Sequence, residues 1–228
     1  MDGQLTRASL LRLAGLAAAG VGLGSAEADA ATGGPAAVAS GLVSCVLTPE
    51  QTEGPYYIPG EKVRRNITEG RPGLPLALRL AVVDVSTCRP IKGAAVDIWH
   101  CDARGLYSGE AANNTVGRTF MRGIQRTNAA GLAIFETAYP GWYQGRTVHI
   151  HIKVHVAGNV AHTGQLYFPD SLTDAVYRKA PYARRAAGRT TRNVDDAIFR
   201  NGGRQSMLGL RKSSNGYVGR ITMGVQRG

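Results

Sequence analysis

Apolar residues alternate with polar ones in several short stretches of this 228-residue chain. A period of two with many β-branched residues is typical of β-strands, whereas amphipathic helices repeat near every 3.6 residues. Closely spaced strands with few helical periods favour an all-β fold, a β-sandwich of about seven to eight mostly antiparallel strands. The alternation predicts strands over residues 76–85, 94–99, 119–126, 131–137, 148–156, 164–168 and 216–225.

The segments between these strands carry turn and helix signals. Residues 170–182 predict the one short helix, and residues 194–199 predict a further turn. Pro90 and Gly93 predict a turn that joins the first two strands as a hairpin. Residues 45–75 hold many prolines and glycines, so we expect an extended arm with little regular structure there.

The N-terminus has the features of an export signal. Residues 1–30 combine a basic start with an apolar run over residues 10–24, and residues 28–30, Ala-Asp-Ala, predict a cleavage site. The pair Arg7-Ala8 stands where a twin-arginine signal has two arginines, so that route is one option for a secreted protein. The apolar run is short and glycine-rich for a membrane span, with an uncleaved anchor as the alternative.

Composition then divides the chain. Residues 31–44 are mostly alanine, glycine, serine and proline, which is typical of a flexible linker. We therefore expect a signal peptide over 1–30, a linker over 31–44 and one β-sandwich domain over 45–228.

Three cysteines make an odd count, which in an exported protein predicts one disulfide and one free thiol. Cys88 lies in the turn of the expected hairpin and Cys101 lies just past its far end. These two should be too far apart to bond. We expect a Cys45–Cys88 disulfide, with Cys45–Cys101 as the alternative.

The formal net charge of +11 is compatible with nucleic-acid binding, but export argues against that partner. A solvated basic surface, attraction to anionic polymers and steering of carboxylated small molecules are the remaining interpretations.

Candidate chemistry centres on the strand over 148–156. His149 and His151 are two residues apart, so their side chains should lie on one face, about 6.5–7 Å apart at the backbone. Two imidazoles can converge on one metal ion from there, and Tyr143 in the preceding Pro-Gly loop can fold over the same ion. Tyr107 lies in a second glycine-flanked loop. The alternative is a half-buried strand whose polar face is exposed to solvent.

Five motifs, in order, resemble those of the intradiol ring-cleavage dioxygenases, across about residues 45–170. In that family a non-haem ferric ion is held by two tyrosines and two histidines. The resemblance therefore implies Fe(III) with Tyr107, Tyr143, His149 and His151 as ligands. The motifs are Thr48-Pro49-Glu50-Gln51-Thr52-Glu53-Gly54-Pro55-Tyr56-Tyr57, Gly105-Leu106-Tyr107, the Pro-Gly turn before Tyr143, the run from Arg146 to His151, and Gln165-Leu166-Tyr167-Phe168.

The resemblance also implies an activity. Enzymes of this family use O₂ to cleave catechol-type rings between the two hydroxylated carbons, giving cis,cis-muconate-type diacids. It implies that Tyr143 takes a substrate proton, that Arg146 stabilises negative charge on the ring and that Gln165 orients a substrate oxygen. The alternatives for the last two are a surface salt bridge and a strand-end amide.

Two other classes of function remain open from the sequence. One is a non-catalytic secreted β-sandwich binding module, and the other is a zinc or copper protein that uses the two histidines. If the protein is a dioxygenase, its partners are a small catecholic molecule and O₂. We expect no nucleic acid, and a membrane only if the signal stays uncleaved. The particular catechol and the oligomeric state are not specified by the residues.

Overall fold

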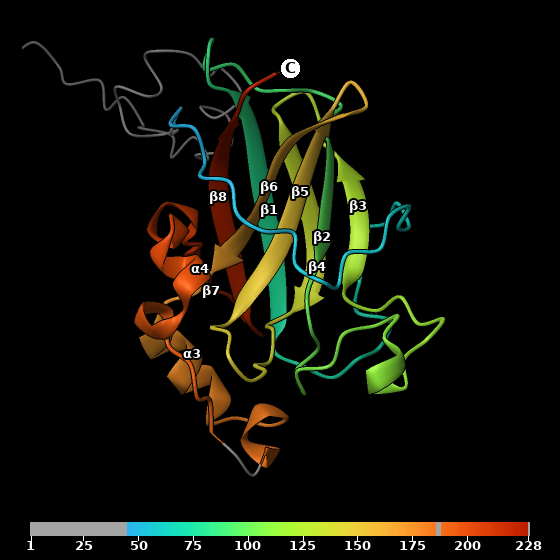
Figure 1. Ribbon diagram of the computed structural model, residues 1–228, viewed down its shortest axis with the longest axis vertical. Helices are drawn as coiled ribbons and strands as arrows, with labels where there is room; N and C mark the ends of the chain where they lie inside the picture. The colour runs from blue at the N-terminus through green and yellow to red at the C-terminus, as the bar shows by residue number, and fades with distance from the viewer. Residues whose placement is uncertain (1–44, 186–187, 228) are drawn as a thin grey trace, which may run out of the picture.

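The computed structural model describes residues 45–185 and 188–227, so the signal peptide and linker expected over 1–44 lie outside the described residues. Within them, eight strands form two stacked four-stranded sheets, and the predicted β-sandwich is confirmed (Figure 1). Its helices are α3 (Asp170–Tyr177) and α4 (Ala197–Arg200). Its strands are β1 (Pro75–Asp84), β2 (Ala95–Trp99), β3 (Arg122–Arg126), β4 (Leu132–Ala138), β5 (His149–Val156), β6 (Asn159–Tyr167), β7 (Gly209–Lys212) and β8 (Tyr217–Val225).

The two sheets have the strand orders β4-β1-β8-β7 and β3-β2-β5-β6. All named pairings are antiparallel except β1 with β8, which is parallel. Strand β6 begins five residues earlier than predicted and β3 three residues later. The sequence analysis missed β7, because its four residues Gly-Leu-Arg-Lys carry too little alternation to mark a strand.

The expected hairpin of the first two strands is wrong. Strand β1 pairs with β4 and β8, whereas β2 pairs with β3 and β5 in the other sheet. The turn between them carries the chain across the sandwich, and Ile91 within it is buried in the core. Turn-forming residues indicate that the chain reverses but not which strands then pair. The Cys45–Cys88 disulfide is nevertheless confirmed, and Cys101 is buried as a free thiol.

The core lies between the facing sheets. Leu78 and Leu80 of β1 and Phe135 of β4 point inward from one sheet, and Ile150 and Ile152 of β5 point inward from the other. All five side chains are fully buried. Burying one such side chain contributes about 1.5–3 kcal/mol, so this core fixes the position of β5 firmly.

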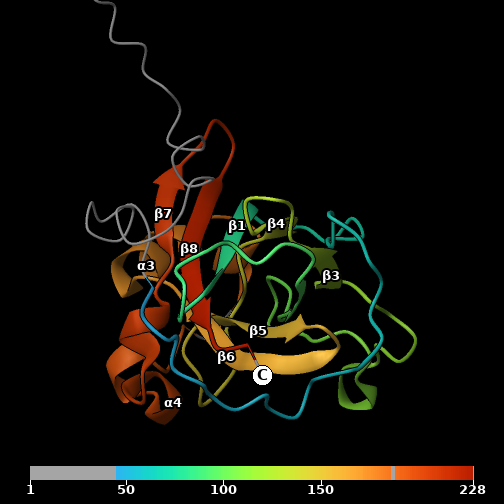
Figure 2. The same cartoon turned by 90° about the horizontal axis from the view of Figure 1, so that it is seen from above.

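The outer face of β5 is also covered, contrary to the expected half-buried strand. The arm that precedes β1 crosses the outside of the second sheet (Figures 1 and 2). It is held by backbone hydrogen bonds from Gln51 to Thr163 and from Arg64 to Ile124, of 2.9 and 3.0 Å. As a result every residue from His149 to Val154 is buried. The arm has little regular structure, as predicted, and it turns a polar strand face into an enclosed site.

The helices are minor. Helix α3 ends at Tyr177, not at the predicted 182, and Pro181 follows four residues later where it would disfavour a continuing helix. Helix α4 and a preceding 3-10 turn, Asn193–Asp195, occupy the region where a turn was predicted. Among the residues that the structure describes, no helix has the length and apolar character that crossing a membrane requires.

Candidate metal centre

Three separate elements bring the four predicted ligands together. Tyr107 comes from the loop after β2, Tyr143 from the loop between β4 and β5, and both histidines from β5 itself. Adjacent ring centroids are 5.7 Å apart for Tyr107 and Tyr143, 5.6 Å for Tyr143 and His149, and 4.6 Å for His149 and His151. The ring centroids of His151 and Tyr107 are 6.2 Å apart, so the four side chains form a closed ring.

The polar atoms of this set converge. The two histidine Nε2 atoms are 3.0 Å apart, and Tyr143 Oη lies 3.1 Å from His149 Nε2. Tyr107 Oη is buried and has no hydrogen-bond partner. Buried polar groups are almost always paired, so an unpartnered phenol beside Tyr143 and His151 points to a missing electrophile. The four residues fit a metal ion.

The histidines are in the state that a metal requires. His149 Nδ1 lies 2.6 Å from Thr147 O and must carry the proton there, which leaves the Nε2 lone pair directed into the site. Burial and then the nearby Arg146 charge lower the pKa of His149 to about 3. Burial and then His149 hold the pKa of His151 well below its usual value. Both imidazoles are therefore neutral at physiological pH and can coordinate a cation.

The tyrosines need a cation to ionise. Burial, and then the neighbouring Tyr143, raise the pKa of Tyr107 well above 10. Burial also raises the pKa of Tyr143, although Arg146 acts in the opposite direction. A phenolate at either position thus requires the charge of a bound metal. Among the described residues no group of three or more His, Cys, Asp or Glu side chains could hold a metal, so the candidate ligand set is the two histidines together with the two tyrosines.

Aromatic residues wall the site. Tyr56 of the arm stacks on Tyr107 with ring centroids 4.1 Å apart, and Trp99 of β2 stacks flat against His151 at 5.0 Å. Gly54 packs so closely that an added Cβ would lie 3.0 Å from His151 Cε1. The sequence analysis did not assign Trp99 to the site. The feature that could have indicated Trp99 is the strand register, which pairs it directly with His151.

Arg146 and Gln165 are also brought to the site. Arg146 Nη2 donates to Gln165 Oε1, and Arg146 Nη1 lies 3.5 Å from His149 Nε2. Gln165 Nε2 donates to Thr52 O of the arm at 3.1 Å. Gln165 is 1% exposed, and Arg146 forms an ion pair with the buried Asp196 while its own side chain is 17% exposed.

Two buried charges were missed by the sequence analysis. Arg122 of β3 is fully buried and donates to Ser108 Oγ, Ser108 O and Tyr56 O, at 2.9, 2.7 and 2.5 Å. It therefore ties the Tyr107 loop to the arm. Asp196, beyond the predicted motifs, accepts a 2.9 Å hydrogen bond from Arg146 Nε. No local sequence pattern marks Arg122 or Asp196, because the partners of each residue lie far away in the sequence.

A separate surface hollow of about 460 Å³ lies on the C-terminal segment. Its lining includes Val194, Phe199 and Arg204 but none of the four candidate ligands. The candidate centre is thus identified from its converging polar atoms and not from this hollow.

Known proteins agree with this architecture. The sequence model of the family described as "Dioxygenase" matches residues 52–185, which include all four candidate ligands, Arg146 and Gln165. An intradiol ring-cleavage dioxygenase from Tetranychus urticae is 40% identical, with a TM-score of 0.75, over 80% of this chain and 95% of that chain. The dioxygenase domain of a dioxygenase carbohydrate-binding fusion from Streptomyces sp. SirexAA-E is 31% identical, with a TM-score of 0.62, over 78% and 97%.

Sequence relatives are more distant. A catechol 1,2-dioxygenase from Acinetobacter lwoffii is 29% identical over 101 residues, 42% of this chain and 32% of the relative. A chlorocatechol 1,2-dioxygenase from Pseudomonas putida is 29% identical over 137 residues, 51% and 52% of the two chains. The matches thus span about a third and about half of these relatives.

The sandwich and its enclosed cluster of tyrosines and histidines define an oxidoreductase of the dioxygenase class. The chain belongs to the intradiol ring-cleavage dioxygenase family.

Proposed function

We propose that this protein binds Fe(III) and uses O₂ to cleave catechol-type rings between the two hydroxylated carbons, giving cis,cis-muconate-type diacids. One observation carries the proposal, the convergence of two neutral imidazoles, the buried phenol of Tyr107 and the partly buried phenol of Tyr143. Intradiol enzymes typically use ferric iron, and family membership supports the same metal here.

Tyr107, Tyr143, His149 and His151 would hold the iron. Anionic phenolate oxygens are hard ligands, so two of them favour a trivalent over a divalent ion. The ferric ion would supply Lewis acidity, withdrawing electron density from a bound catecholate so that O₂ can attack the ring.

The chain's own groups complete the chemistry. Tyr143 accepts one catechol proton at Oη, where burial favours the neutral phenol. The Arg146 guanidinium, beside His149, stabilises negative charge that develops on the ring. Gln165 is held between Arg146 and Thr52, so its amide can orient a substrate oxygen. The arm and Trp99 limit the access of water.

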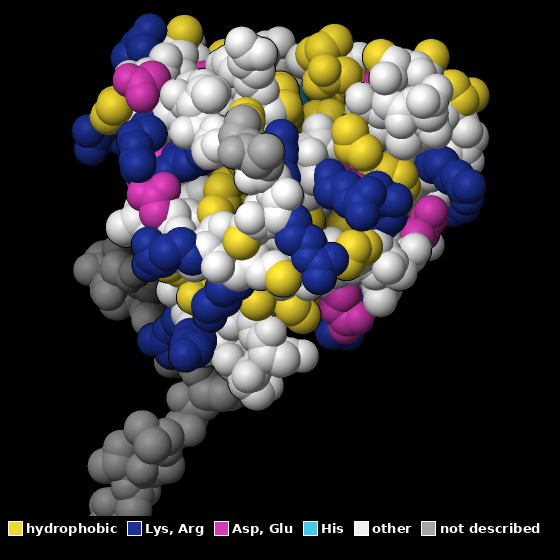
Figure 3. Space-filling view, turned by 90° about the horizontal axis from the view of Figure 1, so that it is seen from below, with side chains coloured by type: hydrophobic (Ala, Val, Ile, Leu, Met, Phe, Trp, Pro, Cys, Tyr) yellow, Lys and Arg dark blue, Asp and Glu magenta, His cyan; other side chains and the backbone are white. Residues whose placement is uncertain are grey.

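The charge of the molecule bears on the substrate. The end that carries the loops of the site is rich in lysine and arginine side chains with fewer acidic ones among them (Figure 3). Such a surface raises the local concentration of anions and speeds their association. We therefore propose that catechols bearing an acidic substituent reach the site faster than neutral ones.

Iron content, the visible spectrum and ring cleavage test the function together. The purified protein should contain one iron per chain and show a broad phenolate-to-iron band that moves to longer wavelength when catechol is added without O₂. Admitting O₂ should then yield the ring-opened diacid, identified by mass, with matched O₂ uptake. A protein that stays colourless after ferric reconstitution refutes the dioxygenase and leaves a binding module. A colourless protein with bound zinc, or a copper protein without the phenolate band, points to the metal alternative.

We also propose export from the cytoplasm. The Cys45–Cys88 disulfide supports it, because disulfides are rare in reducing compartments. Intact mass of the protein from the culture medium tests this proposal, since cleavage after the small-residue site removes about residues 1–30. Retention of the full-length chain inside the cell contradicts it.

A further inference from the structure

Asp196 lies outside the residues 52–185 that the family model matches, yet its carboxylate binds Arg146, which lies beside His149. Oδ2 accepts hydrogen bonds from Arg146 Nε at 2.9 Å and from Thr147 N at 2.8 Å. Oδ1 accepts from Ile198 N at 2.8 Å and Phe199 N at 3.2 Å. The side chain is 2% exposed, so all its acceptor capacity is used inside the protein.

This geometry fixes the direction of the Arg146 guanidinium. The hydrogen bond from Nε to Asp196 fixes the plane of the guanidinium and so limits where its two terminal nitrogens can lie. Nη2 then donates to Gln165 Oε1, and Nη1 lies 3.5 Å from His149 Nε2. A flexible arginine next to an enclosed site would otherwise sample several rotamers, and the bonds to Asp196 and Gln165 leave one.

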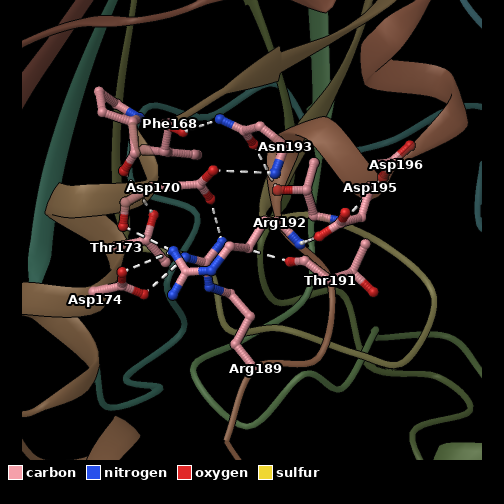
Figure 4. A network of polar contacts seen from close by, with 12 residues as sticks. Phe168, Asp170, Thr173, Asp174, Arg189, Thr191, Arg192, Asn193, Asp195 and Asp196 are labelled. Atoms are coloured by element: carbon pink, nitrogen blue, oxygen red, sulfur yellow. Dashed lines mark hydrogen bonds and ion pairs between the residues drawn. The ribbon is translucent and has the colours of Figure 1, made fainter.

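The segment that carries Asp196 is itself anchored (Figure 4). Arg189 bridges Asp170 and Asp174 of α3, and Arg192 donates to Asp174 Oδ2 at 2.9 Å. Asn193 Nδ2 donates to Phe168 O at 2.9 Å, where β6 has just ended. These contacts hold the turn before Asp196 against the sandwich independently of Arg146.

Thr147 has a second anchor that matters for interpreting a variant. Its hydroxyl donates to Asn193 Oδ1 at 2.6 Å, and its carbonyl is the group that orients His149. Removing the Asp196 charge therefore leaves Thr147, and with it His149, held by Asn193. Removing this charge should therefore displace Arg146 and leave His149 in place.

We propose that Asp196 is a positioning residue for catalysis, acting through Arg146, which it holds against Gln165 and His149. This inference rests on the proposed dioxygenase function. Because Arg146 is assigned to charge that develops during ring attack, its misplacement lowers the rate of chemistry and not substrate binding.

The test compares Asp196→Asn with Asp84→Asn. Both replace a buried carboxylate by an amide, but Asp84 accepts hydrogen bonds from Ser86 and pairs with Arg227 at the end of β1, outside the segment that holds Arg146. We expect D196N to lower kcat by roughly 10–100-fold, the range found when outer partners of a metal site are removed. Iron content, the phenolate band and the anaerobic dissociation constant for catechol should stay near wild type. D84N should keep wild-type kcat.

Two further measurements separate positioning from general damage. In an Arg146→Met background, D196N should cause little additional loss of kcat, because the group it acts through is gone. A crystal structure of metal-free D196N should show the Arg146 guanidinium displaced from Gln165. An additive loss in the double variant, or an unmoved guanidinium, overturns the proposal.

The remaining outcomes also test the proposal. Wild-type kcat in D196N overturns the proposal and leaves the dioxygenase function intact. A wild-type protein that is inactive on every catechol, with Arg146 displaced in D196N, refutes the function while the positioning of Arg146 stands. If D196N does not fold, Asp196→Glu, which keeps the charge one methylene further out, replaces it. A lowered kcat in D196E with iron retained supports the proposal, and wild-type kcat or failure of both variants to fold overturns it.

Discussion

His149 and His151 direct their Nε2 atoms to within 3.0 Å of each other from the same face of β5. The protonated Nδ1 of His149 leaves a lone pair on its Nε2, and the pKa values of both imidazoles are lowered by burial. Two neutral rings in this arrangement, with an unpartnered phenol beside them, are best satisfied by a cation between them.

Replacing either histidine should therefore abolish iron binding. We expect His149→Ala and His151→Ala each to lower iron affinity more than ~100-fold, beyond the loss typical of outer partners, and to remove the visible band. His155→Ala is the matched control, because it lies on the same strand and face but outside the cluster. Metal analysis after equal ferric loading measures the effect. Full iron occupancy in H149A or H151A would be incompatible with the assigned ligands.

Gly54 allows a prediction that separates strain from contact. Gly54 and Gly60 both lie in the arm at positive φ, +75° and +77°, but only at Gly54 would a Cβ meet a neighbour, His151 Cε1 at 3.0 Å. Alanine at either position should cost about 1 kcal/mol of stability. Only Gly54→Ala should weaken iron binding and alter the phenolate band.

Urea unfolding of the metal-free variants measures the shared cost, and iron titration measures the difference. Equal iron affinity in G54A and G60A would show that the arm does not set the position of His151.

The strand pattern was sufficient to place His149 and His151 on one face, because side-chain direction along a strand has a fixed period. It could not show that this face is buried, since the covering arm with Gly54 joins it from about a hundred positions earlier. Asp196 was invisible for the same reason, as its partner Arg146 is 50 residues away. The hairpin error arose because a turn signal at Pro90 carries no information about which sheet the next strand enters.

The Cys45–Cys88 disulfide should contribute measurably to stability. Its sequence separation of 43 residues corresponds to about 4 kcal/mol in the loop-entropy treatment, with less expected in practice. We expect the Cys45→Ser/Cys88→Ser variant to be about 2–4 kcal/mol less stable than wild type in urea. Reductant should destabilise metal-free wild type by a similar amount and leave the double variant unchanged. Sensitivity of that variant to reductant would place the important thiol chemistry at Cys101 instead.

Asp97 predicts a pH dependence of stability. It lies on β2 opposite Lys153 of β5, it is 1% exposed, and neither carboxylate oxygen has a hydrogen-bond partner. Burial, and then the charge of Glu61, raise its pKa from 3.8 to about 7. The folded protein therefore keeps this proton to higher pH than the unfolded chain. The stability that results is fully present below pH 3.8 and is lost as the pH rises through about 7.

Asp97→Asn mimics the protonated acid, so it should remove that dependence. Wild type should lose up to about 4 kcal/mol of unfolding free energy across this window, and D97N should lose less, becoming the more stable protein above neutrality. Urea unfolding of the metal-free proteins between about pH 5 and pH 8 measures both slopes. Asp174→Asn is the control, because hydrogen bonds from Arg189 lower the pKa of Asp174 and confine its contribution to more acidic solution. A wild-type slope in D97N would mean that Asp97 is ionised in the folded protein, with Lys153 balancing its charge across the β2–β5 pair.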